Sequence, residues 1–363
     1  MDKNYDRVPV IIPALNPDNR IFTFIDALKD CGFSTFVVVD DGSDREHKND
    51  IFTRLMECEI TVLTEDDNHG KGKALKEGMS YVYDNMPDAY GVVTADYDGR
   101  QSAESVMLVA DKLLEGNPFV LGARDIKGSN ITKGMRRGYK LTKLVFKLLY
   151  NKKIKDIQTG LRAVERSLIP TFIEVKGSRY EYEPKMIIEA IRNDIPISEV
   201  DVGPIEPINM GEDTIRVSKN YRPFYDSFRI SVVLFLNFLE YALSSITATL
   251  VDFVLFFILS EYVFSSLELN MCVLLSTVCA RAVSSTISFL INRKVVFKSY
   301  NDFLKTIVMF YVLTIIIMLC SAELVTIFVQ LFGGNKTVTK LFVDLCLFFL
   351  SYQIQQRVIF KKK

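Results

Sequence analysis

The chain has 363 residues, with 44 basic and 44 acidic side chains, so its formal net charge is zero. This balance excludes a nucleic-acid binder that relies on bulk positive charge. With 49% hydrophobic residues, the chain is too apolar for a disordered protein and rather apolar for a soluble enzyme. The neutrality joins two unlike parts, because residues 1–230 have a net charge of −4 and residues 231–363 a net charge of +4.

Rare residue types exclude further kinds of site. The chain has no Trp and two His, His47 and His69, so a site built on a histidine cluster is excluded. Its six Cys contain no CxxC spacing, which favours reduced thiols and argues against structural zinc. The first residues are polar and lack an apolar core, so we expect no secretory signal.

Short aliphatic runs alternate with amphipathic stretches across residues 1–228, as in a sheet flanked by helices. We expect strands at residues 8–12, 36–39, 60–63 and 90–94, and helices at residues 21–29, 50–56, 71–83 and 104–115. This order predicts an α/β, Rossmann-like nucleotide-binding domain, whose ligands bind at the carboxyl ends of the strands.

Residues 229–363 are predicted to form an all-α membrane domain. They contain four apolar segments, at about residues 232–259, 269–291, 303–331 and 341–359. Each segment is long enough for the ~20 residues of a bilayer-spanning helix. A buried soluble bundle is the alternative, but it would leave almost no polar surface.

The charges of the connections predict how these helices are oriented. The first connection, residues 261–268, has no Lys or Arg, whereas the second connection and the C-terminal tail are basic. Basic segments stay on the cytoplasmic side. We therefore expect a multi-pass protein of the inner (plasma) membrane with a cytoplasmic catalytic domain, although Lys336 and Lys340 in the third connection argue weakly for the opposite orientation.

Four charged residues fall inside the apolar segments, namely Asp252, Arg281, Glu323 and Asp344. Such charges are costly in lipid, so they usually pair with each other or line a path. At about 1.5 Å rise per residue, Asp252 and Arg281 reach depths that a long Arg side chain can bridge. A purely structural pair and a role in transport both remain open.

Two acidic motifs follow expected strands. Asp40 and Asp41, which precede a Gly-Ser turn, can accept hydrogen bonds from a base and a ribose, although a turn with a helix cap is equally consistent. Asp96 and Asp98 are separated by one residue, so they can hold a hard cation such as Mg²⁺ or Mn²⁺ against a diphosphate. That metal would stabilise a departing nucleoside diphosphate as a Lewis acid.

A Gly- and Lys-rich loop lies between these motifs, at residues 68–75. Its backbone N–H groups and the charge of Lys71 or Lys73 suit a phosphate group. The GxxxxGK[ST] spacing of a P-loop is missing, and a solvated glycine-rich turn is the alternative.

The motifs are Pro13-Ala14-Leu15-Asn16, Val39–Ser43, Asn68–Leu75, Asp96-x-Asp98-Gly99, Leu121–Arg124, Asp156–Arg162 and Glu181-Tyr182-Glu183. In this order, they resemble the dolichyl-phosphate-mannose-synthase-like branch of family 2 glycosyltransferases. The resemblance implies a GT-A fold and transfer of a sugar, with inversion, from a UDP- or GDP-linked donor to a polyprenyl phosphate. In a bacterium that acceptor would be undecaprenyl phosphate, and the product would serve cell-surface glycan modification.

The same resemblance implies a set of site residues. The implied nucleotide-binding residues are Pro13, Ala14, Asn16, Asp40, Asp41, Gly42, Lys71 and Asp96. The implied ligands of Mg²⁺ or Mn²⁺ are Asp96 and Asp98, and the implied catalytic residues are Asp98, Arg124, Asp156 and Gln158. That branch has a further metal-binding glutamine two positions after the second aspartate. Here Arg100 occupies that position and Gln101 follows it, so the third ligand is left open.

A phosphate monoester acceptor is largely dianionic at neutral pH, so it needs cations that place it more than a base that deprotonates it. We expect these cations, near an anionic bilayer surface, to be Arg124, Arg136, Arg137, Lys140 and Arg162. Residues 133–155 put leucines on one helical face and basic residues on another, which predicts an interfacial helix. A surface helix of a soluble domain is the alternative.

Short motifs also mark the four apolar segments: Asp252-Phe253, Ala280-Arg281, Asn292-Arg293-Lys294-x-Val296-Phe297 and Arg357-x-x-Phe360. They resemble the GtrA-like membrane family, which implies a role in positioning or flipping lipid-linked sugars. A processive polysaccharide synthase is excluded, because its QxxRW element needs a Trp. A transporter or binding protein for lipid-linked sugars, with a catalytically weak glycosyltransferase half, is the remaining alternative, and homo-oligomerisation is left open.

Overall fold

The computed structural model describes residues 4–99, 101–126, 133–150, 152–204, 223–297, 299, 301–332 and 335–360. The chain forms two compact units, Met1–Leu234 and Phe235–Lys363. The boundary expected at residues 228/229 falls inside one helix, α9 (Pro223–Ile258), which begins in the first unit and continues in the second.

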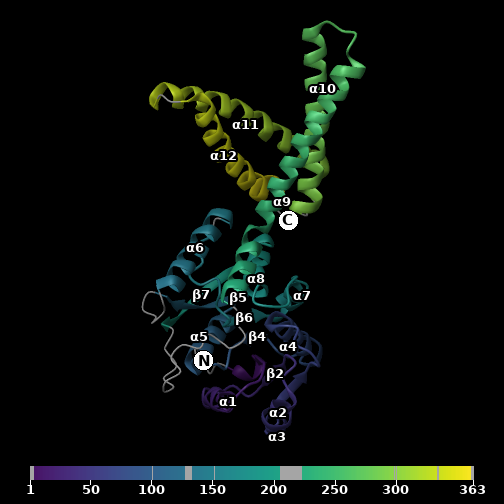
Figure 1. The fold of residues 1–363 in the computed structure, drawn as a ribbon. Coiled ribbons are helices and arrows are strands. Elements are labelled where there is room, and N and C mark those ends of the chain that lie inside the picture. Colours follow the sequence, from purple (N-terminus) through teal and green to yellow (C-terminus); the bar gives the residue numbers. More distant parts are fainter. Residues whose placement is uncertain are drawn as a thin grey trace. The chain divides into compact units, whose positions relative to one another are not determined.

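The first unit contains a seven-stranded mixed sheet with the strand order β3-β2-β1-β4-β6-β5-β7 (Figure 1). Its strands are β1 (Val10–Ala14), β2 (Phe36–Asp40), β3 (Thr61–Thr64), β4 (Gly91–Thr94), β5 (Phe119–Asp125), β6 (Arg162–Glu165) and β7 (Ile197–Pro204). Neighbouring strands are parallel, except that β6 runs antiparallel to both β4 and β5. This is the GT-A-like α/β class that the sequence predicts.

Helices cover both faces of the sheet (Figure 1). They are α1 (Arg20–Asp30), α2 (Arg45–His47), α3 (Thr53–Glu57), α4 (Lys71–Asn85), α5 (Ala103–Leu114), α6 (Lys133–Tyr150), α7 (Ile169–Ile173) and α8 (Tyr182–Arg192). Alternation along β1 sends Val10 and Ile12 into the main core with side chains of α1 and α5. Ile11 points to the other face, where Gly78 lets α4 approach so closely that a Cβ would lie 2.5 Å from Ile11 Cγ2.

The four expected strands and the helices between them are present, with ends shifted by a few residues. Sequence patterns did not predict β5, β6, β7, α7 or α8. In β7, Glu199 and Asp201 interrupt the apolar pattern because this strand lies at the edge of the sheet and is only half-buried. In β6, four residues with charged ends give too short an aliphatic run to be recognised.

The second unit contains four long apolar helices, α9, α10 (Leu269–Ile291), α11 (Phe303–Phe332) and α12 (Lys336–Ile354). Three of them, α9, α10 and α12, continue at their carboxyl ends into one π-helical turn each. These turns are η4 (Leu259–Val263), η5 (Asn292–Val296) and η6 (Gln355–Ile359). Four spans are long and apolar enough to cross a membrane, at 238–263, 269–296, 303–331 and 336–359, as predicted.

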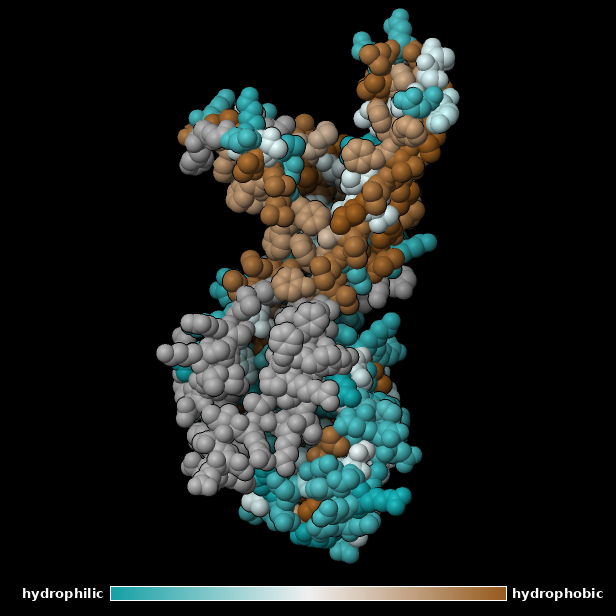
Figure 2. Space-filling model, in the orientation of Figure 1, coloured by the Kyte–Doolittle hydropathy of each residue, from teal (hydrophilic) through white to brown (hydrophobic). Residues whose placement is uncertain are grey.

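Large apolar side chains cover the outside of these helices (Figure 2). Phe253, Leu304 and Leu345, on three different helices, are 69%, 72% and 65% exposed. A soluble bundle would bury such side chains, so the alternative of a water-soluble four-helix domain is wrong. The exposed apolar surface instead fits contact with lipid.

Candidate active site

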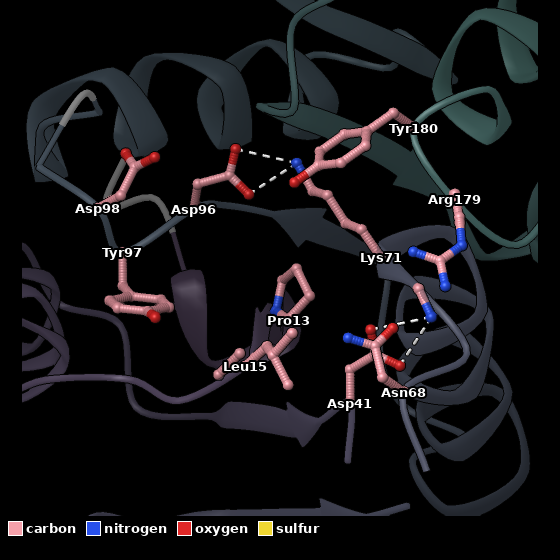
Figure 3. A pocket seen from close by; sticks show the side chains of 12 residues that line it. Pro13, Leu15, Asp41, Asn68, Lys71, Asp96, Tyr97, Asp98, Arg179 and Tyr180 are labelled. Carbon is pink, nitrogen blue, oxygen red and sulfur yellow. Dashed lines mark hydrogen bonds and ion pairs between the residues drawn. The ribbon is translucent and has the colours of Figure 1, made fainter. Parts of the chain in front are cut away.

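A pocket lies at the carboxyl ends of β1, β2 and β4, where the loops after these strands meet the segment before α8 (Figure 3). Residues on its walls are Pro13, Ala14, Leu15, Asp41, Asn68, Gly70, Lys71, Asp96, Tyr97, Asp98, Arg179 and Tyr180. Six residues expected to bind nucleotide or metal are among them, namely Pro13, Ala14, Asp41, Lys71, Asp96 and Asp98.

Asp41 ties the turn after β2 to the Gly/Lys loop. Its Oδ1 accepts hydrogen bonds from the backbone N–H groups of His69 and Gly70, both at 2.9 Å, and its Oδ2 accepts a second one from Gly70 at 2.9 Å. Burial raises the pKa of the Asp41 carboxyl, and the N–H groups of Gly70 and His69 partly oppose that shift. The carboxylate therefore positions the loop at the pocket wall.

Asn16, Asp40 and Gly42 lie behind this wall and support it. The buried Oδ1 of Asp40 accepts a hydrogen bond from the Ser43 N–H at 2.8 Å. Asn16 joins the same turn, because its N–H donates to Ser43 Oγ at 2.8 Å. A Cβ on Gly42, whose φ is +72°, would lie 2.3 Å from the Asp67 backbone. These three residues shape the turn behind the residues that line the pocket.

Lys71 carries a largely buried charge that pairs with Asp96 (Figure 3) and with Glu183. Its Nζ lies 2.7 Å from Asp96 Oδ1 and 2.9 Å from Glu183 Oε1. Burial alone would lower the pKa of Lys71, but the charges of Asp96 and Glu183 outweigh it and raise the pKa. The ammonium group is therefore protonated and holds the first acidic residue of the Asp96-x-Asp98 motif.

Gly160 makes room for this ion cluster. A Cβ at this position would lie 2.5 Å from Asp96 Oδ2, 2.6 Å from Lys71 Nζ and 3.1 Å from Glu183 Oε1. The backbone carbonyl of Gly160 also accepts a hydrogen bond from Thr94 Oγ1 at 2.9 Å, which fixes the loop before β6 against the end of β4. A side chain here would displace the charges from the pocket.

Asp96 and Asp98 have the donor chemistry of a divalent cation site. Both line the pocket with carboxylate oxygens, the ligands that Mg²⁺ and Mn²⁺ prefer. Gln101 supports Asp96, because its Oε1 accepts from the Asp96 N–H at 3.0 Å and its Nε2 donates to Asp96 Oδ2 at 3.2 Å. Within the part of the chain that the structure describes, no group of three or more His, Cys, Asp or Glu residues could hold a metal. Arg100 lies outside the described residues.

Arg124 and Asp156 form a second buried pair near α6. Arg124 Nε donates to Asp156 Oδ2 at 2.5 Å and Nη2 to Asp156 Oδ1 at 3.1 Å, while Nη2 lies 3.4 Å from the Tyr139 hydroxyl of α6. Burial would lower the pKa of Arg124, but Asp156 outweighs burial and raises it. The N–H of Gln158 also donates to Asp156 Oδ1 at 3.1 Å. Asp156 thus positions Arg124, and none of these three residues lines the pocket.

Arg162 does not lie at a surface. Its side chain is buried, and its guanidinium donates to the backbone carbonyls of Thr159, Ile157 and Glu183. The expectation that Arg162 binds the acceptor phosphate at the membrane interface does not fit this position. A buried guanidinium group needs hydrogen-bond acceptors. The hydrogen bonds of Arg162 supply them and join the loop before β6 to α8.

Helix α6 ends at Tyr150, earlier than the expected residue 155. Phe146, Leu149 and Tyr150 are buried, whereas Leu144 and Leu148 are 52% and 49% exposed. Lys140 and Lys147 are exposed beside them, and Arg136 is half-buried. Arg137 belongs to α6, but its side chain lies outside the description. The helix thus presents exposed leucines and lysines together.

Sequence reasoning missed three residues of this region. Arg179 and Tyr180 line the pocket, and Glu183 completes the Lys71 ion cluster. A signal was available, because Arg179 and Tyr180 directly precede the motif Glu181-Tyr182-Glu183, for which the sequence suggested no role. Nothing in a single sequence shows that this segment folds against the Gly/Lys loop.

In the membrane unit, the expected pair is present: Arg281 Nη2 lies 3.3 Å from Asp252 Oδ2, and Ser284 Oγ donates to Asp252 Oδ1 at 2.9 Å. Lys340 Nζ pairs with Asp344 Oδ2 at 2.9 Å in the second half of the unit. Pairing lowers the free energy needed to place these charges in lipid, so a structural role is sufficient to explain them without a role in transport.

Two family models match the chain. Residues 10–171 match glycosyl transferase family 2, and residues 240–360 match the GtrA/DPMS transmembrane domain. The chain is 26% identical over 216 residues to the UDP-N-acetylglucosamine–dolichyl-phosphate N-acetylglucosaminyltransferase of Methanococcus voltae, covering 53% of this chain and 83% of that protein. It is 27% identical over 199 residues to glycosyltransferase AglJ of Haloferax volcanii, covering 54% and 62%. Both matches agree with the resemblances in the motifs.

Solved structures also resemble the chain, at low identity. Glucosyl-3-phosphoglycerate synthase of Mycobacterium tuberculosis, crystallised with Mn²⁺, UDP and glucosyl-3-phosphoglycerate, has 19% identity and a TM-score of 0.47, covering 63% of this chain and 78% of that one. Mannosyl-3-phosphoglycerate synthase of Rubrobacter xylanophilus has 18% identity and a TM-score of 0.46, covering 62% and 71%.

Proposed function

We propose that this chain, which joins a family 2 glycosyltransferase domain to a GtrA/DPMS transmembrane domain, transfers a sugar with inversion from a nucleotide sugar to a polyprenyl phosphate. The observation that carries the proposal is the pocket whose walls include Asp41, after β2, and the Asp96-x-Asp98 motif, after β4, at the carboxyl ends of strands on either side of β1 (Figure 3). The name of the Methanococcus voltae relative, which joins a UDP-linked donor to a dolichyl phosphate acceptor, supports the same reaction class.

The donor would lie across the pocket. Asp41 offers a carboxylate to base or ribose donors, and Pro13 and Leu15 give an apolar wall beside it. Tyr97 and Tyr180 supply aromatic faces on the same walls. Either a UDP- or a GDP-linked sugar is compatible with these groups.

The diphosphate of the donor would lie at Asp96 and Asp98. These carboxylates would hold Mg²⁺ or Mn²⁺, which supplies Lewis-acid stabilisation of the departing diphosphate when bound. Lys71 would stay at the same place as a fixed positive charge, because Glu183 also holds it. Arg179 lines the pocket and is a further cation available to the phosphates.

The acceptor needs cations and an apolar path. An oxygen of the dianionic lipid phosphate would attack the anomeric carbon while the bond to the nucleoside diphosphate breaks, so no strong base is required. Arg124, oriented by Asp156, with Arg136, Arg137 and Lys140 of α6, would place the phosphate. The exposed Leu144 and Leu148 on α6 would rest on the bilayer.

The experiment uses the full chain in detergent or nanodiscs with radiolabelled UDP- and GDP-sugars, undecaprenyl phosphate and Mg²⁺ or Mn²⁺. We expect a chloroform-soluble labelled product, and we expect Asp98→Ala to reduce its formation by at least about a hundredfold. Asp88→Ala is the matched control, because this aspartate lies between α4 and β4, away from the pocket.

Full activity of Asp98→Ala, or no product with any common donor, would contradict the proposal. Binding of a lipid-linked sugar without turnover would instead favour a transporter or binding protein. Mass spectrometry of the lipid product identifies the sugar directly.

A further inference from the structure

The membrane unit contains the same short sequence twice. Residues 291–298 read Ile-Asn-Arg-Lys-Val-Val-Phe-Lys, and residues 354–361 read Ile-Gln-Gln-Arg-Val-Ile-Phe-Lys. Four of the eight positions are identical, and three more exchange Asn for Gln, Lys for Arg or Val for Ile. The first copy ends the hairpin α9–α10, and the second ends the hairpin α11–α12.

Both copies have the same local structure. Each follows a long helix with one wider turn, η5 or η6, closed by a hydrogen bond from the N–H of the Phe to a carbonyl five residues earlier, at 2.8 Å in both. Their burial agrees at five of the seven described positions: for example, Asn292 and Gln355 are 1% and 4% exposed, while Val295 and Val358 are 51% and 56% exposed.

The two copies meet each other through equivalent residues. Asn292 Nδ2 donates to Gln355 Oε1 at 3.0 Å, and the rings of Phe297 and Phe360 stack with centroids 5.1 Å apart. Contact between equivalent positions is what a twofold axis produces, because each residue on the axis faces its own counterpart.

Contacts away from that axis occur in reciprocal pairs. Phe289, two residues before the first copy, contacts Phe360 of the second copy with ring centroids 5.8 Å apart. Tyr352, two residues before the second copy, contacts Phe297 of the first copy at 5.9 Å. The same two rings also pack edge-on against the first residue of the first apolar span in the opposite hairpin. Phe289 meets Phe303 at 5.5 Å, and Tyr352 meets Phe238 at 5.2 Å.

We propose that the membrane unit is an internal repeat, in which the hairpins α9–α10 and α11–α12 are copies of one motif related by a pseudo-twofold axis between Asn292 and Gln355. The basic residues that end each copy lie at equivalent positions, so both hairpins have the same orientation and the axis runs along the membrane normal. Parallel repeats related in this way occur in membrane transporters.

The amide pair is the hinge of this repeat. A rocking motion that pivots where the two copies meet would leave the Asn292–Gln355 bond and the Phe297–Phe360 stack in place while the far ends of the hairpins move. Gln355 Nε2 also donates to the Tyr241 hydroxyl and to Ser351 Oγ, both at 3.1 Å, which fastens this end further. Away from η5 and η6, the hairpins diverge within the unit (Figure 1). We infer that the two hairpins rock as two bodies about the amide pair. This inference does not depend on the proposed transfer reaction.

The test is a pair of distance measurements by double electron–electron resonance in nanodiscs of phosphatidylethanolamine and phosphatidylglycerol. The six native cysteines are first replaced by serine or alanine. One nitroxide pair occupies the exposed Val295 and Val358, beside the hinge, and the other occupies the exposed Ser265 and Thr337, at the far ends of the hairpins. We expect one narrow distance distribution for the first pair and a broad or two-peaked distribution for the second. Equally narrow distance distributions for the two nitroxide pairs would contradict a hinge at the amide pair.

Matched substitutions test the symmetry itself. We expect Phe297→Leu and Phe360→Leu to lower the thermal midpoint of the full chain by similar amounts, and a large loss for only one of them would contradict equivalence. Combining Asn292→Leu with Gln355→Leu should broaden the distance distribution between positions 295 and 358. An unchanged distribution in that double variant would show that the amide pair does not hold the two hairpins together.

Discussion

At the level of single residues, the pocket depends as much on groups that hold other groups as on those that face a ligand. Lys71 fixes Asp96, Asp156 fixes Arg124, and Asp41 fixes the loop at residues 68–70. Each is an ion pair or a charge-assisted hydrogen bond in a partly water-excluded place, where such interactions are strong. Preorganised charge of this kind is what a reaction with a departing diphosphate needs.

The glycine that makes room for the ion cluster gives the first prediction. In Gly160→Ala the new methyl group would fall 2.5 Å from Asp96 Oδ2 and 2.6 Å from Lys71 Nζ, so the cluster must shift. We expect transfer activity to fall by roughly tenfold or more while the fold persists, because about 1 Å of misplacement has such effects in active sites. Gly116→Ala is the control, since its Cβ meets nothing within 4 Å and it reports only the backbone cost of a φ of +89°.

Activity and thermal stability of both variants are measured on the full chain. A Gly160→Ala variant as active as the parent would mean that the cluster tolerates displacement. Equal losses of activity in both variants would mean that the loss reflects general destabilisation of the first unit and not a displaced ion cluster.

Asp41 gives a prediction about pH. Burial raises the pKa of this carboxyl in the folded chain, so its contribution to stability is complete below the unfolded pKa and is lost as pH rises through the folded value. Asn does not titrate, so the stability of Asp41→Asn relative to the parent should increase from acidic to neutral pH. Thermal denaturation of both full-length proteins across that range measures the difference, and a difference independent of pH would contradict the raised pKa. The same variant should transfer less sugar.

Residue types at the site follow from the sequence, but their directions do not. Asp40 and Asp41 are adjacent, and the side chains of adjacent residues at a strand end point to opposite sides, so only one of them can face the pocket. Asp41 does so, and Asp40 binds the turn at Ser43. Arg162 shows the same limit, because nothing in its motif distinguishes a buried guanidinium that satisfies carbonyls from one that meets a phosphate.

At the level of elements, long periodic segments could be predicted and short interrupted ones could not. The four membrane spans and α6 carry periodicity over many residues, so their positions were predictable. The strands β6 and β7 are defined by their neighbours in the sheet, and their own residues carry little signal. The segment before α8 reaches the pocket only through tertiary packing, since Ser178 O accepts from the Lys73 N–H at 3.0 Å.

Helix α6 carries the element-scale prediction. Its exposed Leu144 and Leu148 lie beside exposed lysines, and replacing both leucines by serine removes apolar area that we propose inserts into lipid. We expect weaker binding to vesicles of anionic lipid and a higher KM for polyprenyl phosphate, with the KM for the nucleotide sugar unchanged. The KM of the lipid acceptor, measured in nanodiscs, provides the check.

Met56→Ser combined with Leu108→Ser is the matched control for this experiment. Both side chains are exposed, at 53% and 41%, on other helices of the first unit. If the control raises the KM of the lipid acceptor as much as the α6 variant does, the loss reflects general stability and α6 has no special contact with the bilayer.

At the level of the whole chain, the zero net charge has a spatial meaning. The acidic excess belongs to the first unit, and the basic excess belongs to the connections and tail of the membrane unit. Lys340, which argued weakly against the expected orientation, pairs with Asp344 at 2.9 Å, so the third connection contributes less free positive charge than the sequence suggests. The uneven distribution of basic residues among the connections predicts that both copies of the repeated sequence, residues 291–298 and 354–361, face the cytoplasm.

Labelling with a membrane-impermeant maleimide tests this orientation. In a cysteine-free background, Ser265→Cys lies in the connection after the first span, and Val295→Cys lies where the second span ends. Since both residues are exposed, each introduced thiol is accessible from one side of the bilayer. We expect intact spheroplasts to label position 265 and to leave position 295 unlabelled until the membrane is permeabilised. The reverse pattern would place the pocket on the outer side, away from nucleotide sugars, and would contradict the proposed reaction and the orientation together.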